Sequence, residues 1–177
     1  TYLNLAFSQY TLGQQGDPEM FVQAIESYDL LLQKFPEGNY ADSSLYYQGE
    51  SYYALDKKQE AVAAYQRLAD AHADSALRRD GLYALGVTLE ELEDHARAGD
   101  VYDQYLDEYA EHELATEVRM RKAETLLQSD QIDQASELFG QAAGVAGFAL
   151  ADHALFRQAF CLVKQDENAA AAEVYAR

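Results

Sequence analysis

The sequence predicts an all-α fold, a solenoid of about five helical hairpins stacked along the chain. Three observations support this prediction. Small and aromatic residues recur every 36 or 37 positions, and short polar turns separate segments with apolar residues at helical spacing. The chain of 177 residues also contains 49% hydrophobic residues with only 2 Pro and 10 Gly. This composition favours continuous helices over disorder.

The recurring pattern is a small residue, a second small residue twelve positions later, and an aromatic residue four positions after that. It is clearest at Gly49, Ala61 and Tyr65. Two antiparallel helices need small side chains where their backbones touch, so each repeat predicts a helical hairpin. We expect its aromatic residue to lie in the core. The corresponding residues are Ala24 and Tyr28 in the first unit, Gly86, Ala98 and Tyr102 in the third, Ala123, Ala135 and Phe139 in the fourth, and Ala159, Ala171 and Tyr175 in the fifth.

The first hairpin begins with a predicted helix over Thr1–Leu12. Its second helix begins at Asp17-Pro18-Glu19, with Asp17 as the N-cap and Pro18 at the first helical position, and it ends near Lys34, before Pro36. Aligning Ala6 with Gly49 leaves six extra residues in this hairpin. We expect them in the turn around Gly13–Gly16.

The later helices are placed by the turn residues between apolar segments. A turn at Asp56–Lys58 precedes a helix from about Gln59, and Ser75 is a candidate cap for the next helix. The remaining predicted helices are Ala76–Glu91, Ala96–Glu111, Leu114–Gln128, Ile132–Gly144, Ala149–Lys164 and a last one after a turn at 165–167. The units are approximately 1–38, 39–74, 75–111, 112–147 and 148–177. Both ends interrupt a unit, so we expect this single array, 1–177, to be a segment of a longer protein that carries flanking repeats.

This shared register resembles the tetratricopeptide repeat family, in which small residues mark the helix crossing and a proline often ends the unit. Pro36 fits that proline. The early Trp of the family is replaced by Leu45, Leu82 and Leu155, and by Arg119 in the fourth unit. The resemblance implies a right-handed α-solenoid. Its narrower likeness is to bacterial cell-envelope members of the TolA-binding and outer-membrane-assembly type, which would place the chain in the bacterial periplasm or cell envelope. The cytoplasm stays open.

The charge of the chain limits its partners. The formal net charge is -18, from 31 acidic and 13 basic residues. Such a field repels phosphate backbones, so we do not expect nucleic acid as a partner. No segment approaches the roughly 18 apolar residues of a membrane span, so direct membrane insertion is not expected. The acidic surface either serves solubility or attracts a basic partner.

The sequence offers no convincing set of catalytic or metal-binding groups. Cys161 lies in an apolar segment and predicts a buried, inert thiol. His72, His95, His112 and His153 fall at helix ends or turns, without the i, i+4 spacing of a metal pair. The acidic stripe Asp100, Asp103, Asp107 and Glu111 lacks the loop and glycine of a calcium-binding hand, which favours a hydrated helix face. We therefore predict a protein that is not an enzyme and has no cofactor or metal.

The family resemblance implies a binding groove on the first helices of the hairpins. Residues three before, one after and four after the small residue would face it, and here they form an apolar and aromatic ladder interrupted by three glutamates. The ladder would suit a protein or peptide with apolar side chains and occasional Lys or Arg; packing between neighbouring units is the other interpretation. The candidate partner-binding residues are Tyr46, Glu50, Tyr53, Tyr83, Val87, Glu90, Met120, Glu124, Leu127, Phe156 and Phe160.

The sequence is compatible with three functions. The first is a non-catalytic scaffold for protein–protein interaction that binds a peptide or protein segment in this groove. The second is a structural spacer within a longer repeat protein or envelope assembly, with no ligand in the groove. The third, an acidic cation-binding or enzymatic module built on the stripe, has the least support.

Overall fold

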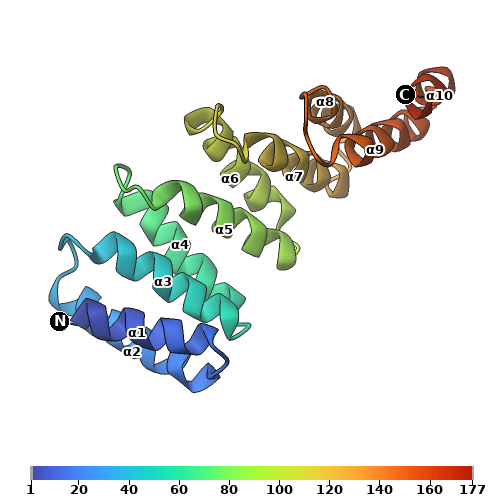
Figure 1. Cartoon of the computed structure of the whole chain (residues 1–177). Coiled ribbons are helices and arrows are strands. Elements are labelled where there is room, and N and C mark those ends of the chain that lie inside the picture. The colour runs from blue at the N-terminus through green and yellow to red at the C-terminus, as the bar shows by residue number, and fades with distance from the viewer. Residues whose placement is uncertain (1, 177) are drawn as a thin grey trace. The chain divides into compact units, whose positions relative to one another are not determined.

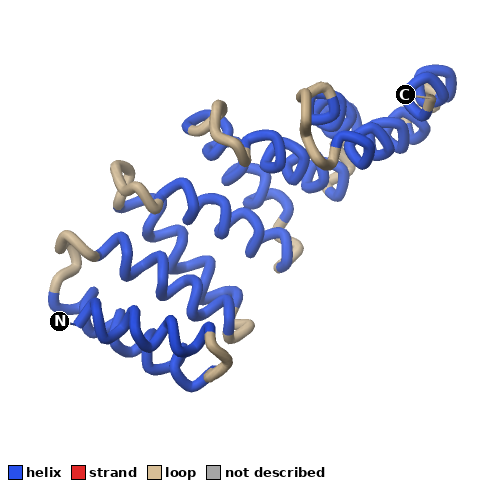
Figure 2. Tube along the Cα trace, in the orientation of Figure 1, coloured by secondary structure: helices blue, strands red, loops and turns tan. Residues whose placement is uncertain are grey.

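A computed structural model describes residues 2–176 as helices joined by short turns and loops, with ten helices and no strand in that range (Figures 1 and 2). Thr1, where the first predicted helix begins, and Arg177 lie outside the described residues. The chain divides into two compact parts, an N-terminal half that ends at Thr88 and a C-terminal half that begins at Leu89. The helices are α1 (Tyr2–Gln14), α2 (Pro18–Lys34), α3 (Ala41–Ala54), α4 (Lys58–Ala71), α5 (Arg78–Glu91), α6 (His95–Glu108), α7 (Ala115–Gln128), α8 (Ile132–Ala143), α9 (Ala151–Lys164) and α10 (Asn168–Tyr175).

The turns inside the last four hairpins share one construction. The middle residue of each turn adopts the left-handed backbone conformation, and the N–H of the residue after it closes the preceding helix. Lys57 N–H, for example, donates to the carbonyl of Tyr52 at 2.9 Å. This six-to-one bond satisfies a helix-end carbonyl. The middle residues are Asp56 (φ 56°), Glu93 (φ 59°), Asp130 (φ 60°) and Asp166 (φ 62°).

We expect Glu93→Gly to stabilise the protein by about 0.5–1 kcal/mol. A residue with a Cβ costs about 1–2 kcal/mol in the left-handed conformation, and glycine avoids this cost, although its greater unfolded-state freedom offsets part of the gain. Gln131→Gly is the matched control, because Gln131 also follows a helix end but has φ -91°. Urea unfolding should give a higher midpoint for Glu93→Gly and a lower one for Gln131→Gly. A lower midpoint for both would contradict the expectation.

The extra length of the first hairpin lies in its helices, so the predicted long turn at Gly13–Gly16 is wrong. The turn between α1 and α2 has the same three residues as the others, 15–17. Helix α1 continues to Gln14 and α2 begins at Pro18, each three residues longer relative to the crossing than α3 and α4. The missing Cβ of Gly13 permits this, because a Cβ there would lie 2.7 Å from the Phe21 ring. Asp17 caps α2 as predicted, accepting from Glu19 N–H at 3.2 Å.

Three other helix ends differ from the sequence prediction by two or three residues, and one of them is the start of α9, at Ala151 rather than Ala149. Helix α5 begins at Arg78 rather than Ala76; before it, the Ser75 hydroxyl accepts from Leu77 N–H at 3.1 Å. Helix α6 ends at Glu108, so Glu111 lies outside it and the predicted acidic stripe is shorter. Beyond that end, His112 Nδ1 lies 3.0 Å from the Tyr105 hydroxyl and accepts from Leu114 N–H at 3.3 Å. These bonds order a loop where the periodicity suggested one more helical turn.

The core sits where the two helices of a hairpin cross. A Cβ added to Gly49 would lie 2.5 Å from the ring of Tyr65, so the backbone of α3 touches that side chain directly. Four of the five predicted core aromatics are fully buried, namely Tyr28, Tyr65, Tyr102 and Phe139. The prediction for Tyr175 is wrong, since this side chain is 52% exposed. It lies at the end of α10, the last helix of the described residues, which packs on α9.

Candidate functional site

In the N-terminal half, the predicted groove residues lie on α3 and α5 and retain accessible surface. Tyr46, Glu50 and Tyr53 are spaced by four and three residues, so they share one face of α3. Tyr46 is half-buried, with its ring 5.2 Å from Tyr47 and 6.2 Å from Tyr65, whereas Tyr53 is exposed. On α5, Tyr83 and Val87 are half-buried. The face is therefore partly anchored in the core and partly open.

Glu50 is the charged group of this face. Its Oε1 accepts a hydrogen bond from the Tyr65 hydroxyl at 2.5 Å. Burial raises the pKa of Glu50 above its usual value; the bond from Tyr65 opposes this shift and the nearby Asp80 carboxylate reinforces it. The same burial, with the Glu50 charge, raises the pKa of Tyr65. No cation contributes to the environment of Glu50 within the described residues.

In the C-terminal half, the two predicted groove glutamates are already paired. Glu90 Oε2 lies 2.9 Å from Arg121 Nη1. Burial raises the pKa of the Glu90 carboxyl, although the Tyr102 hydroxyl and the Arg121 charge oppose the shift. Glu124 takes a bidentate contact from Arg157, whose Nε donates to Oε1 at 2.6 Å and whose Nη2 contacts Oε2. Both carboxylates thus have cationic partners from the next hairpin.

The apolar ladder of this half is only partly accessible. Met120 is 7% exposed and packs in a buried cluster with Ala123 and Phe139, so its assignment to the groove is wrong. The position three before the crossing faces α8 here, because a long unbranched side chain fills the space between the paired helices. Leu127 packs against the same cluster. Phe156 is 53% exposed and Phe160 is half-buried.

One further register position, which the predicted groove residues do not include, carries charged contacts in the structure. Arg121 and Arg157 both lie two residues before a crossing alanine, and both reach a glutamate on the preceding first helix. The Arg157 guanidinium also lies 5.8 Å from the centre of the Phe139 ring and 5.4 Å from that of Phe160. The sequence carries a signal for this position, because an arginine stands two residues before the crossing alanine in two successive units. The predicted groove positions lie three before, one after and four after the crossing residue, so they leave this arginine out.

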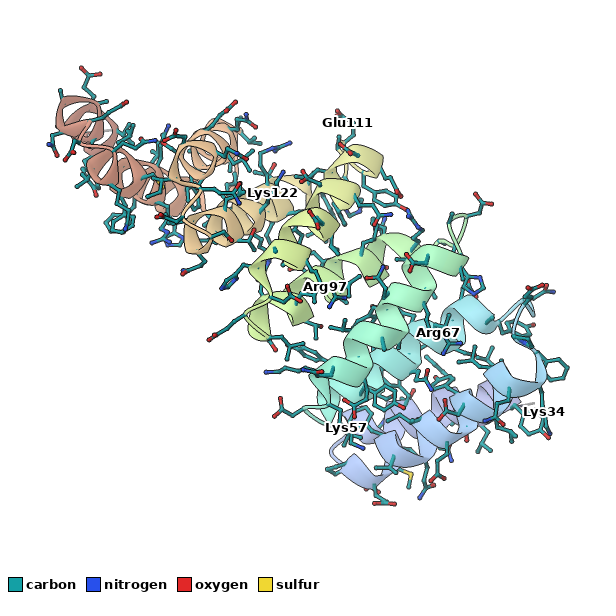
Figure 3. The ribbon with its side chains drawn as sticks, turned by 180° about the vertical axis from the view of Figure 1, so that it is seen from behind. Lys34, Lys57, Arg67, Arg97, Glu111 and Lys122 are labelled. Carbon is teal, nitrogen blue, oxygen red and sulfur yellow. The ribbon has the colours of Figure 1, made fainter. Side chains whose placement is uncertain are left out.

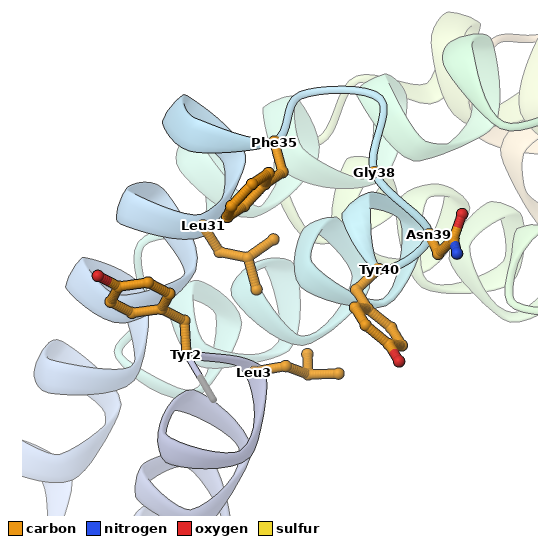
Figure 4. A pocket seen from close by; sticks show the side chains of 7 residues that line it. All are labelled: Tyr2, Leu3, Leu31, Phe35, Gly38, Asn39 and Tyr40. Carbon is orange, nitrogen blue, oxygen red and sulfur yellow. The ribbon is translucent and has the colours of Figure 1, made fainter.

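An apolar pocket of about 490 Å³ lies in the N-terminal half, where the start of α1, the end of α2 and the loop to α3 meet (Figure 4). The Lys34 ammonium donates a hydrogen bond to the hydroxyl of Tyr2, one of the lining residues, at 2.7 Å. The side chains that line it are Tyr2, Leu3, Leu31, Phe35, Gly38, Asn39 and Tyr40.

The acidic face of α6 borders a smaller cavity of about 260 Å³ in the C-terminal half. Lys122 of α7, which is labelled in Figure 3, lines this cavity. Its ammonium pairs with the carboxylate of Asp103 on α6. Cys161 is buried, as predicted. Across residues 2–176, no three His, Cys, Asp or Glu side chains gather closely enough to hold a metal ion. None of the helices in that range combines the length and the apolarity that a bilayer span requires.

Comparison with known proteins supports the tetratricopeptide resemblance in the middle of the chain. The family model described as "Tetratricopeptide repeat" matches residues 43–75 and 80–112, two segments whose starts are 37 residues apart. Together they include Tyr46, Glu50, Tyr53, Tyr83 and Val87. No curated protein matches the chain.

Solved structures share the fold over nearly the whole chain. A crystal structure of MamA protein has a TM-score of 0.77 at 15% identity and covers 99% of this chain and 86% of its own. MamA from Desulfovibrio magneticus RS-1, from residue 41 to its end, has a TM-score of 0.73 at 15% identity, covering 99% and 89%. The nearly identical TPR-like repeats of a putative kinesin light chain from Podosopora anserina give 0.70 at 16% identity, covering 94% and 90%. The predicted all-α solenoid is confirmed. These matches give no support to the narrower likeness to TolA-binding or outer-membrane-assembly proteins.

Proposed function

We propose that this chain, which matches the tetratricopeptide repeat model in two hairpins and shares the fold of MamA, is a non-catalytic scaffold for protein–protein interaction. The main support for the proposal is that the residues matched by the family model include the partly exposed aromatic face of α3 and α5. Tetratricopeptide arrays present such first-helix faces as continuous surfaces. We assign the partner site to the N-terminal half, at Tyr46, Glu50, Tyr53, Tyr83 and Val87.

The partner that suits this face is a peptide or protein segment with apolar side chains and a basic residue. Half-buried tyrosines offer rigid aromatic area at low entropic cost, which is typical of residues that dominate binding energy. Glu50 supplies a carboxylate between them, and the net charge of -18 favours approach of a cationic partner.

The C-terminal half supports the alternative role, a structural spacer. Its two glutamates are neutralised by Arg121 and Arg157, and Met120 is buried. Phe156 and Phe160 remain as candidate contacts in this half. We therefore propose that binding specificity lies in the N-terminal half.

Selection of phage-displayed random 12-residue peptides on the full chain tests this function. The double variant Tyr46→Ala/Tyr83→Ala is expected to weaken the selected peptides by roughly tenfold or more, with unchanged helicity by circular dichroism. Tyr53→Ala, at the exposed end of the face, is expected to weaken them less. The matched control is Phe35→Ala/Tyr40→Ala, two exposed aromatics of the loop between α2 and α3. Failure to select any binder, or a loss confined to the control, would reject the proposal.

A further inference from the structure

The ion pair between Glu124 and Arg157 joins two fixed positions of neighbouring repeats. In the N-terminal half, the first of these positions holds a glutamate but the second does not hold an arginine. Glu124 lies one residue after the crossing Ala123, and Arg157 lies two residues before the crossing Ala159. The same two positions on α3 and α5 are Glu50, one after Gly49, and Ala84, two before Gly86. The Glu50 carboxylate is therefore present, but the position that would hold its arginine partner on α5 is Ala84, whose side chain is a methyl group.

Among the residues that the structure describes, no positive charge compensates that of Glu50. Its Oε1 is held by the Tyr65 hydroxyl, and the charged neighbour that perturbs it is another carboxylate, Asp80. Asp80 itself lies 2.9 Å from Arg79 of the same helix. A half-buried carboxylate without a cation is costly, and a guanidinium placed beside it would lower that cost.

The C-terminal half shows how a guanidinium binds beside the glutamate at this repeat position. Arg157 makes two parallel contacts with Glu124 while its cationic group lies near the Phe139 and Phe160 rings. Tyr65 is the counterpart of Phe139 in the repeat and already contacts Glu50. Tyr46 lies one turn before Glu50 on the same face. A carboxylate flanked by aromatic rings is the arrangement that binds arginine more specifically than lysine.

We propose that Glu50 forms an arginine subsite, in which the guanidinium of a bound peptide takes the place that Arg157 occupies beside Glu124. This inference rests on the proposed function, since it specifies the residue that the partner segment presents to the face of α3 and α5. The glutamates Glu90 and Glu124 do not serve the partner in this way, because their own chain supplies the cation.

The test uses the arginine-containing peptides from the selection and their citrulline analogues, which keep the shape and lose the charge. Citrulline is expected to weaken binding to the unchanged protein by roughly tenfold. In Glu50→Gln, whose amide oxygen still accepts from Tyr65, the arginine and citrulline peptides should bind equally. Ala84→Arg should weaken the arginine peptide through the internal guanidinium and leave the citrulline peptide unaffected. Glu124→Gln is the matched control and should retain the full difference between the two peptides.

The outcomes separate this inference from the proposed function. If arginine and citrulline peptides bind the unchanged protein alike, or if Glu50→Gln weakens both equally, the arginine subsite is wrong. Binding that still depends on Tyr46 and Tyr83 would then keep the scaffold function. Binding that ignores those tyrosines as well would reject the function. Should Ala84→Arg fail to fold, the comparison of the two peptides on Glu50→Gln decides the question alone.

Discussion

Gly49→Ala is expected to destabilise the protein by roughly 2–3 kcal/mol, although alanine is the better helix former. The added Cβ would lie 2.5 Å from Cε1 and 2.7 Å from Cδ1 of Tyr65. That ring cannot move aside, because Tyr65 is only 1% exposed and its hydroxyl is bonded to Glu50. The helices α3 and α4 must then separate, which weakens the packing of the whole hairpin.

Gly99→Ala is the matched control for this prediction. Gly99 also lies inside a helix, α6, but the nearest atom to its added Cβ is Thr125 Oγ1 at 3.7 Å, an ordinary contact. Removing a helix-interior glycine should therefore stabilise this variant by about 0.5–1 kcal/mol. Urea unfolding measures both changes, and hydrogen exchange should localise the loss in Gly49→Ala to α3 and α4. Equal stability of the Gly49→Ala variant and the unchanged protein would show that the crossing is not closely packed.

Tyr65→Phe and Tyr28→Phe are expected to change stability in opposite directions. The two tyrosines occupy the same repeat position and are almost fully buried, at 1% and 0% exposure. The Tyr65 hydroxyl donates to Glu50, so its removal leaves a half-buried carboxylate without that bond and costs about 1–3 kcal/mol. The Tyr28 hydroxyl has no hydrogen-bond partner within the described residues, so its removal should be neutral or stabilising by up to about 1 kcal/mol.

The pH dependence of Tyr65→Phe gives this contrast a second readout. The hydroxyl lowers the pKa of Glu50 by stabilising its charged form, against the larger raising effect of burial. Without it the folded-state pKa rises further, so the folded variant binds the Glu50 proton more tightly than the unfolded chain does. The stability lost in Tyr65→Phe should therefore be smallest at pH 4, below the raised folded-state pKa of Glu50 in both proteins, and should grow as the pH rises through that folded-state pKa. Urea midpoints at pH 4 and pH 7 measure this; a loss that is larger at pH 4 would contradict it.

The repeat made most of the fold predictable, because each hairpin carries its own small residues, its own turn and its own apolar face. Four buried aromatics, the cap at Asp17 and most helix bounds follow from that local chemistry. The first hairpin was harder to predict. Its six additional residues continue both helical patterns, and periodicity cannot distinguish a longer helix from a longer turn when Gly13 and Gly16 lie between them.

The candidate site was less predictable than the fold. Met120 and Tyr83 share a repeat position, yet Met120 is buried and Tyr83 is half-buried, because α8 closes over the methionine. Tyr175 matches the core register and is nevertheless exposed, since α10 is the last helix of the described residues and no further described hairpin follows it. In both cases the deciding neighbour lies on another helix.

The sequence by itself determined that this chain forms helical hairpins, since the spacing of small residues limits how two consecutive helices can touch. Only the tertiary structure decided which of the predicted groove carboxylates have a cationic partner within the chain. Glu90 and Glu124 meet arginines about one repeat away, whereas Glu50 meets the hydroxyl of its own hairpin. The sequence shows which residues are carboxylates, but whether a carboxylate has a cationic partner depends on the side chain that the next hairpin places beside it.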